Sequence, residues 1–181
     1  MVLQQPSEGF WAFARSKAEI MSEALELVER MVEALNNHVI EGQEEFWSED
    51  MVWHGPAGIG TKHGLKDFQD NHQRPFLHAF PDKLADDQIR FGAGEWVAAT
   101  GIQRATHRGD WLGIPASGTQ VEVRYMDIWR AHDGKLVENW VLIDILGFLE
   151  QLGYDVASVL RFIGSKPPSF FEEPAPLGRE D

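Results

Sequence analysis

The sequence contains no cysteine in its 181 residues. Disulfide bonds and thiolate metal sites are therefore excluded. Histidines are present, but His63, His72 and His78 follow neither the HExxH pattern nor another spacing typical of metal ligands. We therefore expect no metal site.

Long apolar runs are also missing from the sequence. No stretch approaches the ~20 consecutive apolar residues that cross a bilayer. The first residues lack the continuous apolar segment of a secretory signal peptide. We expect a cytoplasmic protein with no membrane partner.

Basic residues are scarce relative to acidic ones. The chain has 16 Lys and Arg against 29 Asp and Glu, which gives a formal net charge of -13. Nucleic acids and anionic membranes bind basic protein surfaces, because the positive side chains displace the cations that are condensed on these polyanions. Neither is therefore expected as a partner, and a neutral or weakly polar small molecule suits this chain better.

The remaining composition is ordinary for a globular protein. Hydrophobic residues make up 43% of the chain, and its length suffices for one domain with its own core. We divide the chain into an N-terminal arm at residues 1–15, a single domain at residues 16–164, and a flexible, acidic, proline-containing tail at residues 165–181.

Helical patterns dominate the first half of the predicted domain. A capping box begins at Ser16, and apolar residues at helical spacing continue to Val39 before Gly42 ends the helix. A further helix should start at Leu65 and end or kink at Pro75.

The second half shows the alternation of strands. Strands are expected at residues 51–54, 84–91, 96–107, 120–130 and 135–143, and short helices at residues 146–152 and from residue 156 onward. Turns at residues 92–95 and 132–134 should close two hairpins. This order predicts an α+β fold in which a curved antiparallel sheet packs on N-terminal helices around a pocket. Cystatin-like and ferredoxin-like domains share the same order of elements.

Local motifs help to choose among these folds. In chain order they are Trp53-His54-Gly55-Pro56, Phe80-Pro81-Asp82, Thr106-His107-Arg108-Gly109, Gly113-Ile114-Pro115, Asp133-Gly134-Lys135, Glu138-Asn139-Trp140 and Gln151-Leu152-Gly153. Together they resemble the SnoaL-like polyketide cyclases, also called ester cyclases, of the nuclear transport factor 2-like superfamily. The resemblance covers roughly residues 20–153.

The resemblance implies a cone-shaped, NTF2-like (cystatin-like) α+β barrel with a deep pocket. It also implies a homodimer formed through the outer face of the sheet, and no metal or organic cofactor. Characterised members of the family close a ring by intramolecular aldol condensation of an aromatic polyketide methyl ester, with an aspartate as general acid and base. The matching position in this sequence is Asp144.

The surroundings of Asp144 allow two interpretations. Regular alternation places Trp140, Leu142 and Asp144 on one strand face, so that these apolar neighbours would desolvate the carboxylate and raise its pKa. Asp144 would then be the catalytic acid and base on a hydrophobic, polyketide-like substrate. Alternatively, Asp144 is the N-cap of the helix that follows it.

Other residues complete the predicted site. His107 is a second catalytic candidate that could polarise a carbonyl, or else a turn histidine that faces solvent. His54 is expected near the mouth of the pocket, or else in a structural hydrogen bond to the loop that follows it. Trp53, Trp140 and Leu142 are expected along the wall of the pocket. Tyr125 and Asp127 should point into the cavity, or else toward a dimer interface or solvent.

Two other functions fit the sequence. An epoxide hydrolase of the limonene-epoxide-hydrolase type would use Asp127, Arg124 and Asp144. Arg124 and Asp127 fall on opposite faces of a regular strand, however, unless a β-bulge intervenes. A non-catalytic small-ligand carrier would need the pocket but not Asp144.

Overall fold

The computed structural model describes residues 23–165. The predicted arm at residues 1–15, the predicted helix start at Ser16 and all but the first residue of the predicted tail lie outside the described residues. The first described element is a helix at residues 23–36, within the range that the sequence predicted. Between residues 23 and 165, no helix has both the length and the apolar character needed to cross a membrane.

Short helical segments follow this first helix. Their bounds are η1 Gln43–Glu45, α2 Leu65–Phe68, η2 Gln69–Gln73, α3 Arg74–Ala79, α4 Ile145–Gln151 and α5 Val156–Gly164. Pro75 does not end the helix, because helical structure continues to Ala79. The segment η2 is a π-helical turn, and Pro75 lies directly after it, in the first turn of α3.

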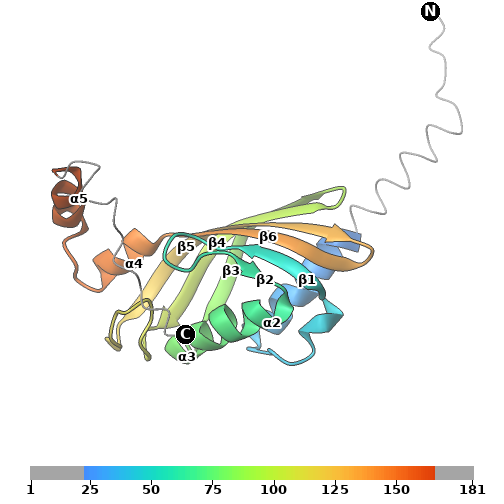
Figure 1. The fold of residues 1–181 in the computed structure, drawn as a ribbon, viewed down its shortest axis with the longest axis horizontal. Coiled ribbons are helices and arrows are strands. Elements are labelled where there is room, and N and C mark those ends of the chain that lie inside the picture. The colour runs from blue at the N-terminus through green and yellow to red at the C-terminus, as the bar shows by residue number, and fades with distance from the viewer. Residues whose placement is uncertain (1–22, 166–181) are drawn as a thin grey trace, which may run out of the picture.

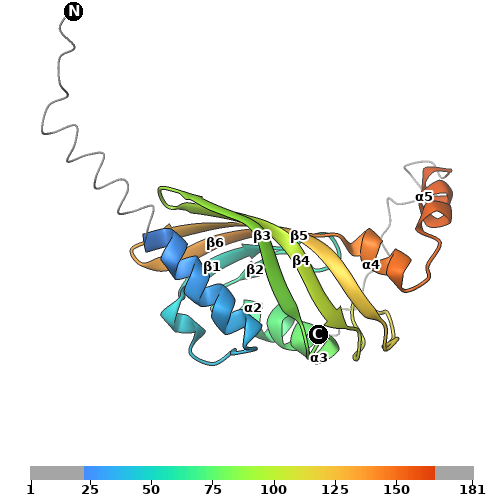
Figure 2. The same cartoon turned by 180° about the vertical axis from the view of Figure 1, so that it is seen from behind.

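Six strands form one curved, open sheet. They are β1 Trp47–His54, β2 Lys62–His63, β3 Leu84–Ala93, β4 Trp96–Thr106, β5 Gln120–His132 and β6 Lys135–Ile143, in the order β2-β1-β6-β5-β4-β3. The sheet is mixed rather than wholly antiparallel, because β1 runs parallel to β6. The helix at residues 23–36, α2 and α3 all lie on the concave face of the sheet (Figures 1 and 2).

The two predicted hairpins are present. Gly94, with a φ of 63°, turns the chain from β3 into β4. Asp133 and Gly134, with φ of 47° and 72°, turn it from β5 into β6. Both positions of the second turn are left-handed, which explains the Asp-Gly pair in the sequence.

A β-bulge interrupts β3 between Asp87 and Ile89. The extra residue reverses the alternation, so that Asp87 and Arg90, three positions apart, can pair on one face. Backbones approach closely here, because a Cβ at Gly101, opposite Asp87, would lie 2.0 Å from the Asp86 carbonyl oxygen. The bulge therefore depends on glycine at position 101.

Two hydrophobic clusters stabilise the fold. The larger lies between the concave face and the helices and includes Trp47, Trp53 and Trp129. The smaller includes Phe80 and Phe148, near α4 and the loop after β4. The interior thus combines aliphatic side chains with several large aromatic ones.

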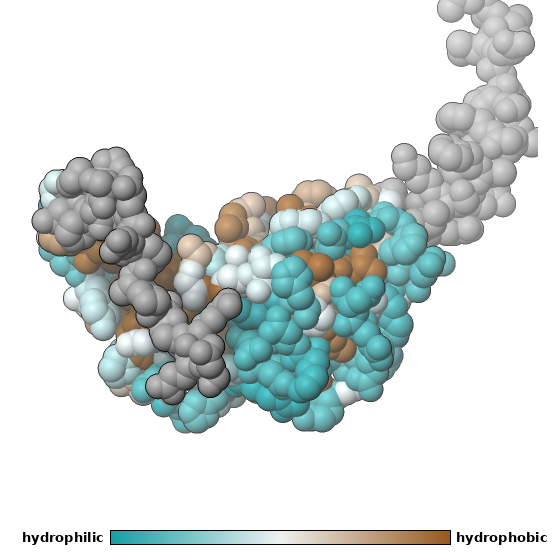
Figure 3. All heavy atoms as spheres, in the orientation of Figure 1, coloured by the Kyte–Doolittle hydropathy of each residue, from teal (hydrophilic) through white to brown (hydrophobic). Residues whose placement is uncertain are grey.

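The outer face of the sheet also carries apolar side chains. Phe91, Met126 and Leu142 are 61%, 56% and 64% exposed, respectively. Figure 3 shows hydrophobic residues along the upper edge, where the outer face of the sheet lies in this view. The homodimer stays a prediction, and this is the surface that it would bury.

Candidate functional site

An internal cavity of about 90 Å³ lies between the concave face of the sheet and the helices. Its apolar wall consists of Leu35, Trp47, Trp53, Phe68, Phe76, Leu77, Trp129, Val141 and Ile143, and its polar groups belong to His72, Gln73, Lys83, Gln103, Asp127 and Asn139. This volume is below the ~300 Å³ of typical small-molecule sites. A polyketide-sized ligand would therefore require the walls to open.

Asp127 is the carboxylate inside this cavity. Burial raises the pKa of Asp127 to about 7, and the negative charge of Asp87 adds to the increase. A hydrogen bond from Asn139 Nδ2 to Asp127 Oδ1, at 2.9 Å, and the charge of Lys83 act in the opposite direction. The carboxyl group can thus accept and return a proton near neutral pH.

A second carboxylate, Asp87, belongs to a network beside the cavity. The Tyr125 hydroxyl donates to Asp87 Oδ1, and Arg90 Nε donates to Asp87 Oδ2 at 2.7 Å. Arg90 also lies 3.7 Å from Glu29 on the helix at residues 23–36. The arginine compensates the charge of Asp87, so Asp87 is a structural partner while Asp127 has no cation bound directly to it among the described residues.

Aromatic rings form one wall of the cavity. His72 stacks on Trp53, with ring centroids 4.1 Å apart, and Trp53 also contacts Phe68. Burial lowers the pKa of His72 to about 3, so its imidazole is neutral at physiological pH. A flat, partly apolar ligand would be well matched to such a wall.

The structure brings together part of the predicted pocket. Trp53 and Asp127 both line the cavity. Tyr125 is buried beside it and reaches Asp87, although it is not a lining residue. All three come from the inward-facing positions of β1 and β5.

Three other predicted pocket residues do not line the cavity. Leu142 is largely exposed, and Trp140 stacks on His54 with ring centroids 4.7 Å apart on the outer face. The alternation in β6 is regular, but its inward-facing residues are Asn139, Val141 and Ile143. The prediction that His54, Trp140 and Leu142 line the pocket is therefore wrong. The cavity is lined by the other face of β1 and of β6.

Asp144 occupies the N-cap of α4. Its Oδ1 accepts a hydrogen bond from Gly147 N at 2.9 Å, and the side chain is exposed. The residue does not line the cavity. The structure thus matches the capping interpretation, and the carboxylate that lines the cavity is that of Asp127.

Replacing Asp144 tests this capping role. Asp144→Ala should lower the free energy of unfolding by about 1 kcal/mol, because α4 loses its cap, while turnover stays close to that of the wild type. Asp155→Ala is a matched control, because Asp155 caps α5 through Ser158 N at the same 2.9 Å. A large loss of turnover in Asp144→Ala alone, measured beside urea unfolding, would contradict this assignment.

His107 is a core histidine, neither exposed nor part of the cavity. Its ring stacks on Phe80 and meets Phe148 edge to face, both with ring centroids 5.3 Å apart, and Nδ1 lies 3.2 Å from Ser117 Oγ. Burial lowers the pKa of His107. The alternative prediction of a solvent-facing histidine is wrong, because the loop after β4 covers the ring. No hydrogen bond joins His107 to Asp144 in the described chain.

The three residues of the hydrolase hypothesis are not assembled. Arg124 is exposed on the outer face of β5, opposite Asp127, and its carbonyl oxygen accepts from Asp144 N at 3.0 Å. The bulge that would bring Arg124 and Asp127 together is absent from β5 over this segment, where the pairing with β4 is regular. The bulge in β3, between Asp87 and Ile89, involves neither residue.

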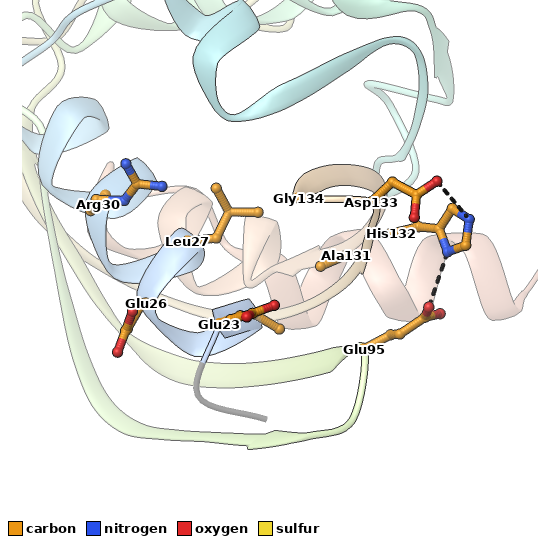
Figure 4. Close-up of a pocket in the computed structure, with 10 residues that line it drawn as sticks. Glu23, Glu26, Leu27, Arg30, Glu95, Ala131, His132, Asp133 and Gly134 are labelled. Carbon is orange, nitrogen blue, oxygen red and sulfur yellow. Dashed lines mark hydrogen bonds and ion pairs between the residues drawn. The ribbon is translucent and has the colours of Figure 1, made fainter. Parts of the chain in front are cut away.

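A wider hollow of about 480 Å³ lies between the helix at residues 23–36 and the β5–β6 turn (Figure 4). His132 lies 3.0 Å from Glu95 and 3.5 Å from Asp133, and these partners raise the pKa of His132. All three side chains are substantially exposed, so they lack the desolvation that activates a carboxylate. The internal cavity is therefore the stronger candidate.

The sequence analysis missed several cavity residues, among them Lys83 and Gln73. Lys83 follows Pro81-Asp82 in a segment that looks like an exposed turn, and Gln73 lies in a polar stretch of helix. Both are buried in the fold, where they line the cavity between the helices and the sheet. No pattern in the sequence marked either residue. Within residues 23–165, no group of three or more His, Asp and Glu side chains is arranged to hold a metal.

Comparison with known proteins relates this chain to enzymes of polyketide chemistry. The sequence model described as SnoaL-like polyketide cyclase matches residues 25–152. A relative in Streptomyces peucetius, aklanonic acid methyl ester cyclase DnrD, is 27% identical over 136 residues, which are 74% of this chain and 92% of that protein.

Solved structures share the fold. IdmH from Streptomyces antibioticus, described as a candidate polyketide cyclase, has a TM-score of 0.64 and 27% identity over 72% of this chain and 99% of its own. AclR from Streptomyces galilaeus, described as a candidate hydroxylase, has a TM-score of 0.65 and 28% identity over 74% and 97%. They confirm the NTF2-like α+β fold, although one fold can host several activities. Because the family match spans more than half of its residues, this chain belongs to the SnoaL-like polyketide cyclase family.

Proposed function

We propose that this protein is a cofactor-independent carbon-acid catalyst that closes a ring by intramolecular aldol condensation. The observation that carries the proposal is Asp127, a half-buried residue whose carboxyl group lies in an aromatic cavity and has its pKa raised to about 7. A base with a pKa near the working pH is the most effective proton acceptor for such a reaction. Membership in a cyclase family raises the expectation of this chemistry.

The reaction requires one group that both accepts and returns a proton. The Asp127 carboxylate takes a proton from the carbon beside a carbonyl, and the electron pair of that C–H bond forms the enolate. The enolate carbon attacks a second carbonyl carbon, and the new alkoxide oxygen takes the proton back from Asp127. Asn139 orients the carboxyl group through its hydrogen bond to Oδ1.

The cavity favours a hydrophobic, partly oxygenated substrate. Trp47, Trp53 and Trp129 supply apolar surface, and Gln73 and Gln103 supply polar contacts. Because the cavity is small, we expect it to hold the reacting carbon and oxygen atoms, with the rest of a polyketide-like substrate near the half-buried Phe76 and Leu77.

Product analysis tests the proposal. Wild type and Asp127→Asn would be incubated with aromatic polyketide methyl esters and with small epoxides in ¹⁸O-labelled water, and products would be followed by chromatography and mass spectrometry. We expect a ring-closed product of unchanged mass from the wild type only. A labelled diol would indicate a hydrolase instead, and tight binding without any product would indicate a carrier.

A further inference from the structure

Lys83 differs from the other lysines that the structure describes. Lys62 donates to Ile59 O at 2.7 Å, Lys66 pairs with Asp70, and Lys135 donates to Glu44 O and Glu45 O. The ammonium group of Lys83, in contrast, forms no hydrogen bond or direct ion pair with any residue from 23 to 165. Lys83 is nevertheless only 6% exposed and lines the cavity.

The backbone around Lys83 is held in place. Lys83 N donates to Phe80 O at 3.1 Å, and Lys83 O lies 2.7 Å from His38 Nε2. Two residues further on, Ala85 exchanges two hydrogen bonds with the Asn36 side chain, at 2.8 and 2.9 Å. The side chain is therefore anchored at its base on the cavity wall.

A buried cation without a partner is costly, which suggests that its partner arrives with a ligand. The negative charges of Asp127 and Asp87 act to raise the pKa of Lys83, yet burial still lowers it to about 8. The ammonium form thus predominates at neutral pH. Asp87 is already compensated by Arg90, so the charge of Lys83 is available to a ligand beside Asp127.

Gln73 provides a second observation in the same cavity. It is 4% exposed, and neither Oε1 nor Nε2 has a hydrogen-bond partner among the residues that the structure describes. An amide group in this state costs free energy unless a ligand satisfies it. Gln73 lies on the π-helical turn η2, on the helical side of the cavity.

We propose that Lys83 is a further catalytic residue, whose ammonium group binds the carbonyl oxygen of an enolisable ketone as that oxygen becomes negative, with the Gln73 amide as a second donor. This inference rests on the proposed function. When Asp127 removes the proton from carbon, the carbonyl π electrons move onto oxygen, and Lys83 stabilises that charge without giving up its own proton. A fixed cation in a desolvated site stabilises such an oxyanion far more than water does.

Binding of substituted nitrophenols tests this role without turnover, because a phenolate oxygen resembles an enolate oxygen. The absorption spectrum shows which form is bound. Wild type should bind the phenolate at pH values below the phenol's own pKa. Lys83→Met should weaken phenolate binding about 10- to 100-fold, as expected for the loss of a charged hydrogen bond, while Gln73→Leu should weaken it less.

Control variants separate this role from a structural one. Lys83→Met should fold normally, since it replaces a buried charge with an apolar chain of similar length. Lys66→Met, in an exposed ion pair, should bind like the wild type, and Lys83→Arg should restore part of the phenolate affinity. Asp127→Asn should bind phenolate at least as tightly as the wild type, because a negative charge is removed.

Three results would overturn the proposal. They are binding of the neutral phenol only by the wild type, equal phenolate affinity in Lys83→Met, and a covalent ketone adduct on Lys83 after borohydride reduction, which would identify an imine-forming amine. If phenolate binding depends on Lys83 but no ring-closed product forms with any substrate, the oxyanion site stands while the proposed aldol reaction fails.

Discussion

Asp127→Asn is expected to lower turnover by about 100- to 10,000-fold, the range typical for loss of a positioned acid and base. An amide cannot accept the proton from carbon, yet it has nearly the same shape as the carboxyl group. The hydrogen bond from Asn139 can be kept, because the new side chain also carries an acceptor oxygen. Substrate affinity should therefore change little, and steady-state kinetics with a separate binding measurement would show this.

The stability of Asp127→Asn provides a check on the same carboxyl group. Its pKa is raised from 3.8 to about 7 in the folded protein, so the folded state retains a proton that the unfolded chain releases. Native stability is therefore lost as pH rises from about 4 to about 7. The asparagine variant has no carboxyl group at this position and so lacks this pH-dependent loss of stability. It should be at least as stable as the wild type at pH 8.

An exposed aspartate supplies the control for this variant. Asp133→Asn changes a side chain that is 92% exposed, in a left-handed turn position that asparagine tolerates. Its turnover should stay close to that of the wild type. Similar losses in both variants, or an unchanged rate in Asp127→Asn, would argue against Asp127 as the base.

Trp53→Ala should cause the largest loss of stability, about 3–5 kcal/mol in the free energy of unfolding. The ring is 2% exposed, packs against Phe68 and stacks on His72. Its removal leaves a large void in the main hydrophobic cluster, beside the cavity. Urea unfolding followed by far-UV circular dichroism would measure the change.

Trp96→Ala is the matched comparison on the opposite side of the sheet. Trp96 is 43% exposed and contacts Trp140 on the outer face. Its loss should cost about 1 kcal/mol or less. Equal costs for the two tryptophans would contradict the assignment of β1 residue Trp53 to the interior.

Elements set by local chemistry could be predicted from the sequence. The strand at residues 135–143 has the bounds that were expected, and the Asp133-Gly134 turn before it needs two left-handed residues. The end of α4 also follows the prediction closely, because Gly153 adopts a φ of 89° just after it. Such signals act within a few residues and do not depend on distant contacts.

The orientation of β6 could not be predicted in the same way. Both of its faces are apolar, with Trp140 and Leu142 on one and Val141 and Ile143 on the other. Alternation states which residues share a face but not which face is buried. Because the outer face of β6 is also hydrophobic, the sequence pattern does not show which face is buried.

The polar part of the site depends on contacts between distant segments. The segment of Lys83, just before β3, is held against the end of the helix at residues 23–36 by hydrogen bonds of Asn36 and His38. The pKa of Asp127 rises because of burial and the charge of Asp87, a residue 40 positions earlier in the chain. The partner of Asp87, Arg90, reaches it because of the bulge in β3. Neither arrangement has a signature in one local stretch of sequence.

Exchange of a carbon-bound proton with solvent tests the central claim most directly. Wild type and Asp127→Asn would be incubated with an aryl methyl ketone in D₂O, and loss of the methyl proton signal would be followed by NMR at several pH values. The account predicts that the wild type accelerates exchange, with a rate that rises as the pH passes about 7 and Asp127 ionises, and that the variant exchanges near the uncatalysed rate. Equal exchange rates for the two proteins would contradict it.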